Sequence, residues 1–323
     1  MATIAFFDVH DWEKTHLKKQ LTGHKCLFFS ESLTKAHIPQ IKDVDALSLF
    51  VHSQLPNEII DVLPKVKLIA LRATGFDNVD LPYCAKKGIA VCNVPFYGAN
   101  TVAEYTFALL LTISRKMNDT CSCVSNNDFT QHTGFDLQGK TIGIIGGGHI
   151  GQHAIRIARG FGMNVVVYDV IKNEFGATTF GYEYVSLTDL LKQSDVISLH
   201  APLNKYTEHI LNSKNMKSIK NGSVLINTSR GGLIETQALY DSIQSGKLAF
   251  AGLDVLEDEN VLLQKQKTSK EKRALLNKLL KDPRVLVTPH NAFNTSEALL
   301  RILDTSIENL QKGLSGKYQN KVN

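Results

Sequence analysis

The chain has 323 residues, of which 43% are apolar and 21% charged, and its formal net charge is +5. This length allows two domains with separate cores, and the composition is ordinary for a globular protein. The longest apolar run, "FALLLTI" at 107–113, is too short to span a bilayer, and the N-terminus lacks the pattern of a secretory signal. The five cysteines show no zinc-type CxxC spacing, so we expect free thiols in a reducing cytoplasm and no metal site.

The positive charge is concentrated in one segment. Residues 265–284 contain eight bases and two acids, a surplus of six that accounts for the whole excess. Such a run can bind nucleic acid, but no aromatic side chains are interleaved with it and no nucleic-acid module is recognisable. A solvated helix face is the favoured interpretation.

The first hundred residues alternate short apolar runs with helical segments, about twenty residues apart. This alternation predicts βα units around a parallel sheet. The apolar runs occupy residues 4–7, 26–29, 46–51, 67–72 and 88–94. The segment that follows, 100–117, is apolar on nearly every side and predicts a deeply buried helix.

A second alternating series begins at residue 141. The predicted strands are 141–146, 164–169, 195–200, 222–229, 250–255 and 284–289. The predicted helices between them are 150–161, 187–193, 235–245 and 270–281. Six strands with interposed helices indicate a doubly wound dinucleotide-binding domain. The final helical segment, 294–313, has no strand after it, and we expect it to pack on the first domain and make that domain discontinuous.

A glycine-rich loop stands where such a domain would bind its cofactor. The stretch "IGIIGGGHIGQH" contains GxGxxG in residues 146–151, after a strand and before a helix. The glycines allow a tight turn, a close approach to pyrophosphate and close helix–strand packing. Asp169 lies 18 residues beyond Gly151, at the end of the next strand. Its carboxylate can accept hydrogen bonds from a ribose diol and would repel a 2′-phosphate, which favours NAD over NADP.

Three polar residues follow three later strands. Arg230 comes after "VLINTS", Glu259 after "AGLDVLED" and His290 after "VLVTP". Ligands in such sheets bind beyond the carboxyl ends of the strands. An arginine can hold a substrate carboxylate, and a histidine oriented by a carboxylate can move a proton to or from a hydroxyl. Individually each residue could be structural, but together they suit hydride transfer to a 2-keto acid.

At these residues the chain resembles the NAD-dependent D-isomer-specific 2-hydroxyacid dehydrogenases, and within them the D-lactate dehydrogenase branch. The resemblance runs through "RATGFDNVDL" (72–81), "NVPFYGANTVAEYTFALLLT" (93–112), "LINTSRGGLIE" (225–235) and "VLVTPHNAFNT" (285–295), besides the glycine loop. It implies two doubly wound α/β domains. A discontinuous flavodoxin-like substrate-binding domain would comprise 1–99 and 295–323, and an inserted Rossmann NAD-binding domain 100–294. The active site would lie in the cleft between them, and closure of the hinge would exclude water.

The resemblance also implies roles for individual residues. Arg230 would bind the substrate carboxylate and carbonyl, His290 would be the acid for keto-acid reduction, and Glu259 would be its partner. The residues implied in substrate binding, besides Arg230, are Thr74, Gly75 and Tyr97. The residues implied in cofactor binding are Gly146, Gly148, His149, Ile150, Gly151, Asp169, Ala201, Pro202, Thr207, Thr228, Ser229 and Asp254.

Two features favour the D-lactate branch: Phe293, and the long charged stretch between Glu259 and His290. The resemblance to this branch implies a small pocket suited to pyruvate. Glyoxylate, hydroxypyruvate or a bulkier keto acid such as 2-ketoisocaproate stays open as the substrate, to be decided by pocket width at Tyr97, Phe293 and residues 52–54. A non-catalytic, NAD-sensing corepressor-like protein stays open as a different class of function. The resemblance implies a homodimer built on 100–117, although the apolar faces of that segment could equally be internal core.

Overall fold

The computed structural model describes residues 1–259 and 269–323, and within them the chain forms two compact units. The first unit comprises Met1–Tyr97 and Thr295–Asn323, and the second Gly98–Asn294. The predicted domain limits fall at 99 and 295. Residues 260–268, including part of the predicted basic segment, lie outside the described residues.

The first unit is built on a five-stranded parallel sheet with the order β2-β1-β3-β4-β5. This is the flavodoxin-like order of a doubly wound sheet. The strands are β1 (Thr3–Phe6), β2 (Lys25–Phe28), β3 (Ala46–Leu49), β4 (Leu68–Leu71) and β5 (Ala90–Cys92). The helices are α1 (Asp11–Gln20), η1 (Lys35–His37), α2 (Ile38–Ile41), α3 (Asn57–Asp61), α4 (Leu81–Lys86) and α13 (Ser296–Leu314).

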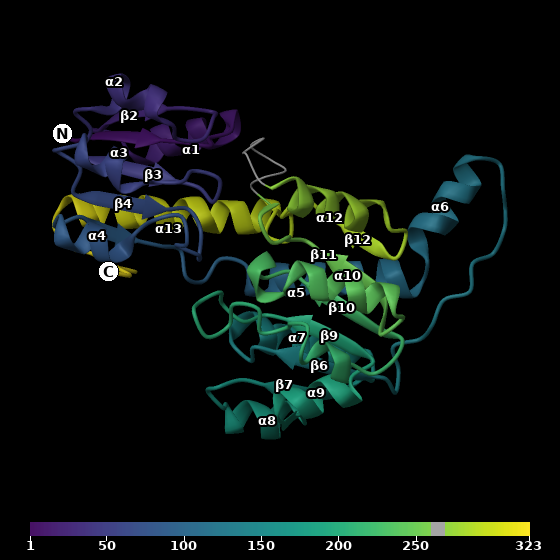
Figure 1. Ribbon diagram of the computed structural model, residues 1–323. Helices are drawn as coiled ribbons and strands as arrows, with labels where there is room; N and C mark the ends of the chain where they lie inside the picture. The colour runs from purple at the N-terminus through teal and green to yellow at the C-terminus, as the bar shows by residue number, and fades with distance from the viewer. Residues whose placement is uncertain (260–268) are drawn as a thin grey trace. The chain divides into compact units, whose positions relative to one another are not determined.

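The last helix, α13, packs on the sheet of this first unit, beside β4 (Figure 1). Asn309 is fully buried and its Nδ2 donates to the carbonyl of Asn93 at 2.8 Å. A Cβ at Gly313 would lie 2.6 Å from a Leu68 side-chain carbon, so the close contact with β4 needs a glycine there. The predicted discontinuous α/β fold is thus confirmed.

The second unit is built on a seven-stranded parallel sheet with the order β12-β11-β10-β9-β6-β7-β8. The strands are β6 (Thr141–Ile145), β7 (Asn164–Tyr168), β8 (Glu183–Tyr184), β9 (Val196–Leu199), β10 (Ser223–Asn227), β11 (Leu248–Leu253) and β12 (Val285–Val287). The helices are α5 (Ala99–Ser114), α6 (Met117–Ser125), α7 (His149–Gly160), α8 (Glu174–Phe180), α9 (Leu187–Gln193), η2 (Met216–Ser218), η3 (Gly231–Leu233), α10 (Thr236–Gln244) and α12 (Lys270–Lys281). From β6 the chain runs outward through β7 and β8 and then crosses back to β9 on the other side of β6, which makes the edge between β6 and β9 the topological switch point of a Rossmann sheet.

The seven-stranded sheet separates two apolar cores because alternate side chains of a strand point to opposite faces. Ile144 and Ile226 belong to the core that α5 and α7 cover, whereas Ile145 and Leu225 belong to the core under α9 and α10. Strands that are buried on both faces read as continuous apolar runs, and this is why they are visible in the sequence.

Some elements differ from the prediction. The segment 100–117 forms α5 only as far as Ser114, because Lys116 has a left-handed backbone with φ 53°. Nine of the 16 residues of α5 are buried within this one chain. The short elements α6, α8 and β8 were not predicted. The described part of the basic segment forms α12, which buries only Leu276 and Leu279.

No helix among the described residues combines the length and the apolar character needed to cross a bilayer.

Candidate active site

Three predicted site residues follow neighbouring strands at one edge of the seven-stranded sheet. Arg230 follows β10, Glu259 follows β11 and His290 follows β12, and these strands pair in that order. Because all are parallel, their carboxyl ends share one edge. The structure thus brings together, within the second unit, three residues that are up to 60 positions apart in the chain.

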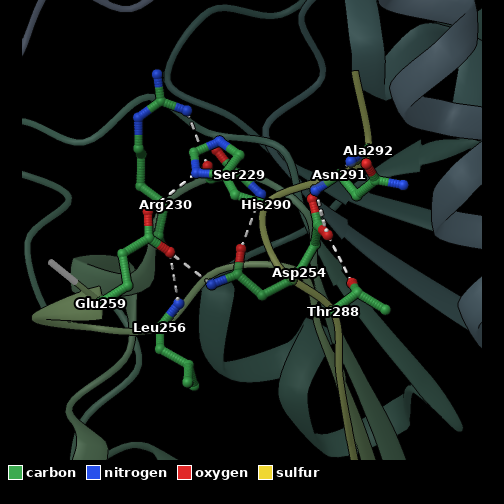
Figure 2. Close-up of polar contacts among 10 residues, drawn as sticks. Ser229, Arg230, Asp254, Leu256, Glu259, Thr288, His290, Asn291 and Ala292 are labelled. Atoms are coloured by element: carbon green, nitrogen blue, oxygen red, sulfur yellow. Dashed lines mark hydrogen bonds and ion pairs between the residues drawn. The ribbon is translucent and has the colours of Figure 1, made fainter. Parts of the chain in front are cut away.

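His290 and Glu259 form a direct side-chain contact (Figure 2). The Nδ1 atom of His290 lies 2.9 Å from Oε1 of Glu259, and the backbone N–H of Leu256 donates to Oε2 of Glu259 at 3.2 Å. The two side chains are 19% and 28% exposed, respectively. A carboxylate held in this way fixes the orientation of the imidazole.

The surroundings of Glu259 determine its charge. Burial acts to raise the pKa of the Glu259 carboxyl, but the hydrogen bond and charge of His290, the Leu256 N–H donor and the charge of Arg230 together lower this pKa below its ordinary value. Glu259 is therefore a carboxylate throughout the physiological pH range, which is the state that an orienting partner of a histidine requires.

The loop that carries His290 is held by Asp254. His290 has a left-handed backbone (φ 51°), which is costly for a residue with a Cβ, and its N–H donates to the Asp254 carbonyl at 2.8 Å. The carboxylate of Asp254 is buried and accepts from Thr288 Oγ1 (2.5 Å), Asn291 N (2.8 Å) and Ala292 N (2.8 Å). Figure 2 shows Asp254 facing Thr288 and Asn291. One buried carboxylate thus stabilises a strained loop at both ends.

Arg230 is positioned by the buried end of β10. The side chain of Asn227 accepts from Ser229 N at 3.0 Å and donates to the carbonyl of Arg230 at 2.9 Å. A Cβ at Gly231 would lie 2.0 Å from the carbonyl carbon of Leu256, so only glycine permits this approach. The Arg230 segment therefore packs directly against the turn that leads to Glu259.

The glycine loop after β6 has the geometry that a dinucleotide needs. A Cβ at Gly146 would lie 2.5 Å from Ala201 N, and one at Gly151 would lie 2.1 Å from the Gly146 carbonyl oxygen. By contrast, a Cβ at Gly148 would meet nothing within 4 Å, so this position faces open space. Gly148 is the N-cap residue of α7, and because glycine has no side chain, it does not cap the first N–H groups of this helix. Helix N–H groups without a protein cap suit phosphate oxygens.

Asp169 stands beside this loop at the end of β7. Its Oδ2 accepts from Gly147 N at 2.6 Å and its Oδ1 from Ile171 N at 2.9 Å. These two backbone donors fix the Asp169 carboxylate next to the glycine loop. The donor set fits an NAD: N–H groups for the pyrophosphate and an acid for the ribose diol.

Further cofactor residues were predicted in the loops after β9 and β10, and hydrogen bonds join these loops to each other, hold the first of them internally and tie the second to α5. Ser229 Oγ donates to the Ala201 carbonyl at 2.6 Å, and Thr207 Oγ1 donates to the Pro202 carbonyl at 2.6 Å. Thr228 Oγ1 lies 2.9 Å from Thr106 Oγ1. These loops lie at the same sheet edge as the glycine loop, at the ends of neighbouring strands.

The predicted substrate-binding residues Thr74, Gly75 and Tyr97 belong to the first unit. Thr74 follows β4, its Oγ1 donates to the Val94 carbonyl at 2.8 Å, and its own carbonyl accepts from Asn93 Nδ2 at 2.8 Å. The backbone carbonyl of Tyr97 accepts from Nε of Arg301 in α13. The roles of these three residues stay predictions.

Some residues that shape this region were not predicted from the sequence. Asn227 was not singled out, and Asp254 was expected only beside the nicotinamide, whereas the structure shows how its side chain holds the His290 loop. A buried polar residue at the end of an apolar strand was the available signal for both. A second histidine–glutamate pair, His209 with Glu257, carried no signal in the sequence.

His200, just past the end of β9, is buried with its Nε2 2.9 Å from Ser198 Oγ. Burial lowers the pKa of His200 from its ordinary 6.5 to about 4. Between these pH values the unfolded chain binds a proton that the folded protein does not, so stability falls as the pH drops through this window and levels off below it.

We expect His200 to contribute up to about 3 kcal/mol to the acid-induced loss of unfolding free energy. Urea unfolding of the wild type and His200→Asn at pH 7, 5.5 and 4 would measure it, and the loss should be smaller in the variant. Equal acid sensitivity of the two proteins would contradict the assignment.

Comparison with known proteins identifies the family. Residues 107–292 match the model of the D-isomer specific 2-hydroxyacid dehydrogenase, NAD binding domain. The chain belongs to this family. Its second unit is therefore the NAD-binding domain, its cofactor is NAD, and the protein is an oxidoreductase of the D-2-hydroxyacid dehydrogenase family.

Individual relatives match almost the whole chain. A D-lactate dehydrogenase of Escherichia coli is 35% identical over 95% of this chain and 95% of its own length. A glyoxylate reductase of Korarchaeum cryptofilum is 34% identical over 85% of this chain and 81% of its own. The crystal structure of D-lactate dehydrogenase from Aquifex aeolicus, complexed with NAD and lactic acid, is similar with a TM-score of 0.90 at 35% identity, over 97% of this chain and 96% of that one. All three resemble this chain over most of its length, whereas the substrates in their names differ.

Proposed function

We propose that this protein is a D-lactate dehydrogenase that reduces pyruvate to D-lactate with NADH. The observation that carries the proposal is the His290–Glu259 pair, with Arg230 on the adjacent strand end of the NAD-binding domain. This set contains an acid, a group that orients the acid and a cation for a carboxylate. These are the groups that reduction of a 2-keto acid needs beyond its cofactor.

Each residue has a separate task in this proposal. NADH, when bound, supplies the hydride that reduces the C2 carbonyl of the substrate. Because Nδ1 of His290 contacts Glu259, Nε2 is the ring nitrogen that donates a proton to the carbonyl oxygen. Arg230 binds the substrate carboxylate with its planar fork and draws electron density from the neighbouring carbonyl. Thr74 and Gly75 would receive the same carboxylate through backbone N–H groups.

The position of Phe293 supports the proposal that the substrate is small. Its ring centroid lies 6.4 Å from that of His290, edge to face. A bulky ring beside the acid limits the room for the C3 substituent of a keto acid, which favours the methyl group of pyruvate. Similarity to the E. coli and A. aeolicus D-lactate dehydrogenases agrees with this, and similarity to a glyoxylate reductase makes glyoxylate the first competing substrate.

The test is NADH oxidation by purified protein with pyruvate, 2-ketoisocaproate, oxaloacetate, glyoxylate and hydroxypyruvate, compared by kcat/KM. Highest efficiency with pyruvate and a D product is expected. A higher kcat/KM with glyoxylate or a bulkier acid would reject pyruvate while keeping the chemistry. Tight NADH binding with no turnover of any acid would instead favour an NAD-sensing role.

We also propose a cytoplasmic homodimer. All five cysteines have free thiols, which suits a reducing compartment. Helix α6 has no buried residue, and in its region Met117, Val124 and Phe129 are 47%, 48% and 78% exposed. A second copy that covered these apolar side chains would remove them from water. Sedimentation equilibrium should give twice the chain mass of 35.8 kDa, and a single-chain mass would reject the dimer.

A further inference from the structure

The second unit contains another histidine–glutamate pair, whose glutamate is close in the chain to Glu259. His209 Nε2 is 2.6 Å from Glu257 Oε1, and the side chains are 38% and 23% exposed. His209 belongs to the loop after β9 that also carries the predicted cofactor residues Pro202 and Thr207, and Glu257 precedes Glu259 by two residues. The pair therefore connects a loop of the cofactor region with the turn that presents the catalytic carboxylate.

Glu257 is fixed at its second oxygen as well. Its Oε2 accepts from the hydroxyl and the backbone N–H of Thr236, the first residue of α10, at 2.5 and 3.2 Å. One carboxylate thus contacts the start of a helix with one oxygen and His209 with the other. Side chains with both oxygens engaged have little freedom to rotate, so the backbone at Glu257 is held in place.

The position of His209 is itself determined by backbone contacts. His209 has a left-handed conformation (φ 49°), its N–H donates to the Gly232 carbonyl at 2.8 Å, and its own carbonyl accepts from Asn212 Nδ2 at 2.9 Å. A strained backbone persists only where the surroundings hold it. These backbone contacts therefore hold His209 beside the Arg230–Gly232 segment, with its imidazole directed at Glu257.

A short turn transmits the position of Glu257 to Glu259. The N–H of Glu259 donates to the Leu256 carbonyl at 3.2 Å, and the N–H of Leu256 donates back to Oε2 of Glu259 at 3.2 Å. Asp258, between the two glutamates, has φ 58° and accepts from Lys272 Nζ at 2.7 Å. The turn also packs closely against Gly231: a Cβ at Gly231 would lie 2.2 Å from Glu257 N, so the turn cannot move closer to Gly231.

We propose that the His209–Glu257 pair is a positioning device for the catalytic carboxylate: it holds the turn 256–259 so that Glu259 meets His290. This inference rests on the proposed function of His290 as the acid. Small displacements of an orienting group lower the rate steeply, by up to about 100-fold for 1 Å. His209 and Glu257 are thus positioning residues that act through Glu259.

The first test is a set of variants assayed with the best keto acid of the wild type. We expect His209→Leu and Glu257→Ala each to lower kcat about 10–100-fold, with KM and the Kd of NADH (fluorescence titration) changed less than about threefold. His209→Gln, whose amide can still donate to Glu257, should recover most of the rate. A matched control is His16→Leu, which breaks a comparable pair of 2.9 Å with Asp304 in the other unit and should leave kcat unchanged.

The second test needs no turnover. In crystals of His209→Leu we expect the 2.9 Å contact between Glu259 and His290 to be lost. Retention of this contact, or a rise in the Kd of NADH at unchanged kcat, would overturn the proposal, because the pair would then serve only the cofactor loop. If the wild type reduced no keto acid, the proposed function would fail, yet the crystal structure would still decide whether the pair positions Glu259.

Discussion

Replacement of His290 by asparagine is expected to lower kcat for keto-acid reduction by about 10²–10⁴-fold, the usual contribution of a general acid. Asparagine can still donate to Glu259, which lies 2.9 Å from Nδ1 in the wild type, but it has no proton to give to a developing alkoxide. The expected loss therefore lies in kcat, and the KM of the keto acid should change little. Steady-state NADH oxidation measures both constants.

The control for this variant separates chemistry from folding. His290 has a strained backbone with φ 51°, and asparagine adopts this conformation more readily than most residues. Thermal unfolding and NADH binding by His290→Asn should therefore match the wild type. A variant that kept more than a tenth of the wild-type kcat would show that another group supplies the proton.

Glu259→Gln should have a smaller effect than His290→Asn because it removes only the partner of the acid. Since the pKa of Glu259 lies below its ordinary value, the wild-type carboxylate stays charged into the acidic range, and its contribution is lost only as the pH falls through that lowered pKa. The neutral glutamine would lack this contribution at every pH.

Replacement of Arg230 by glutamine is expected to lower kcat/KM for the keto acid by about 10²–10³-fold, mainly through a higher KM. In the proposed function this change removes a charge-assisted contact with the substrate carboxylate. Arg230→Lys retains the charge but not the planar fork, and it should recover only part of the loss. Assays over a wide range of keto-acid concentration resolve KM from kcat.

Arg273→Gln provides a matched control for these variants. Arg273 is exposed on α12 and carries the same charge, so its loss tests whether net charge alone affects the binding of an anionic substrate. Its kcat/KM should equal that of the wild type. If Arg230→Gln left KM unchanged, the carboxylate would have to be bound elsewhere, and Thr74 and Gly75 would be the first residues to test.

Much of the fold follows from local patterns in the sequence. The five strands of the first unit and six of the seven in the second were predicted because they form continuous apolar runs, as is typical of parallel strands, most of which are buried on both faces. The missed strand, β8, has two residues at the sheet edge, Glu183 and Tyr184, and no such run. The helix α6 buries no residue, so its segment lacks the apolar stripe that identifies a surface helix.

The sequence by itself also determined the cofactor loop and the types of the three polar groups. Gly146 and Gly151 must lack a Cβ, and this requirement is visible as a motif with a strand before it and a helix after it. Arg230, Glu259 and His290 were predicted because each follows an apolar strand, and parallel strands end at one edge.

Only the tertiary structure decided what orients these groups. The hydrogen bonds that Asp254 accepts from the His290 loop span more than 30 positions, and the His209–Glu257 contact spans 48. The residues in these contacts come from separate loops, and polar residues in loops have no periodicity. No local pattern therefore predicts which of them will be in contact. Such contacts arise when the sheet order places loops distant in the chain at adjacent strand ends, and this order is set by the packing of the two apolar cores.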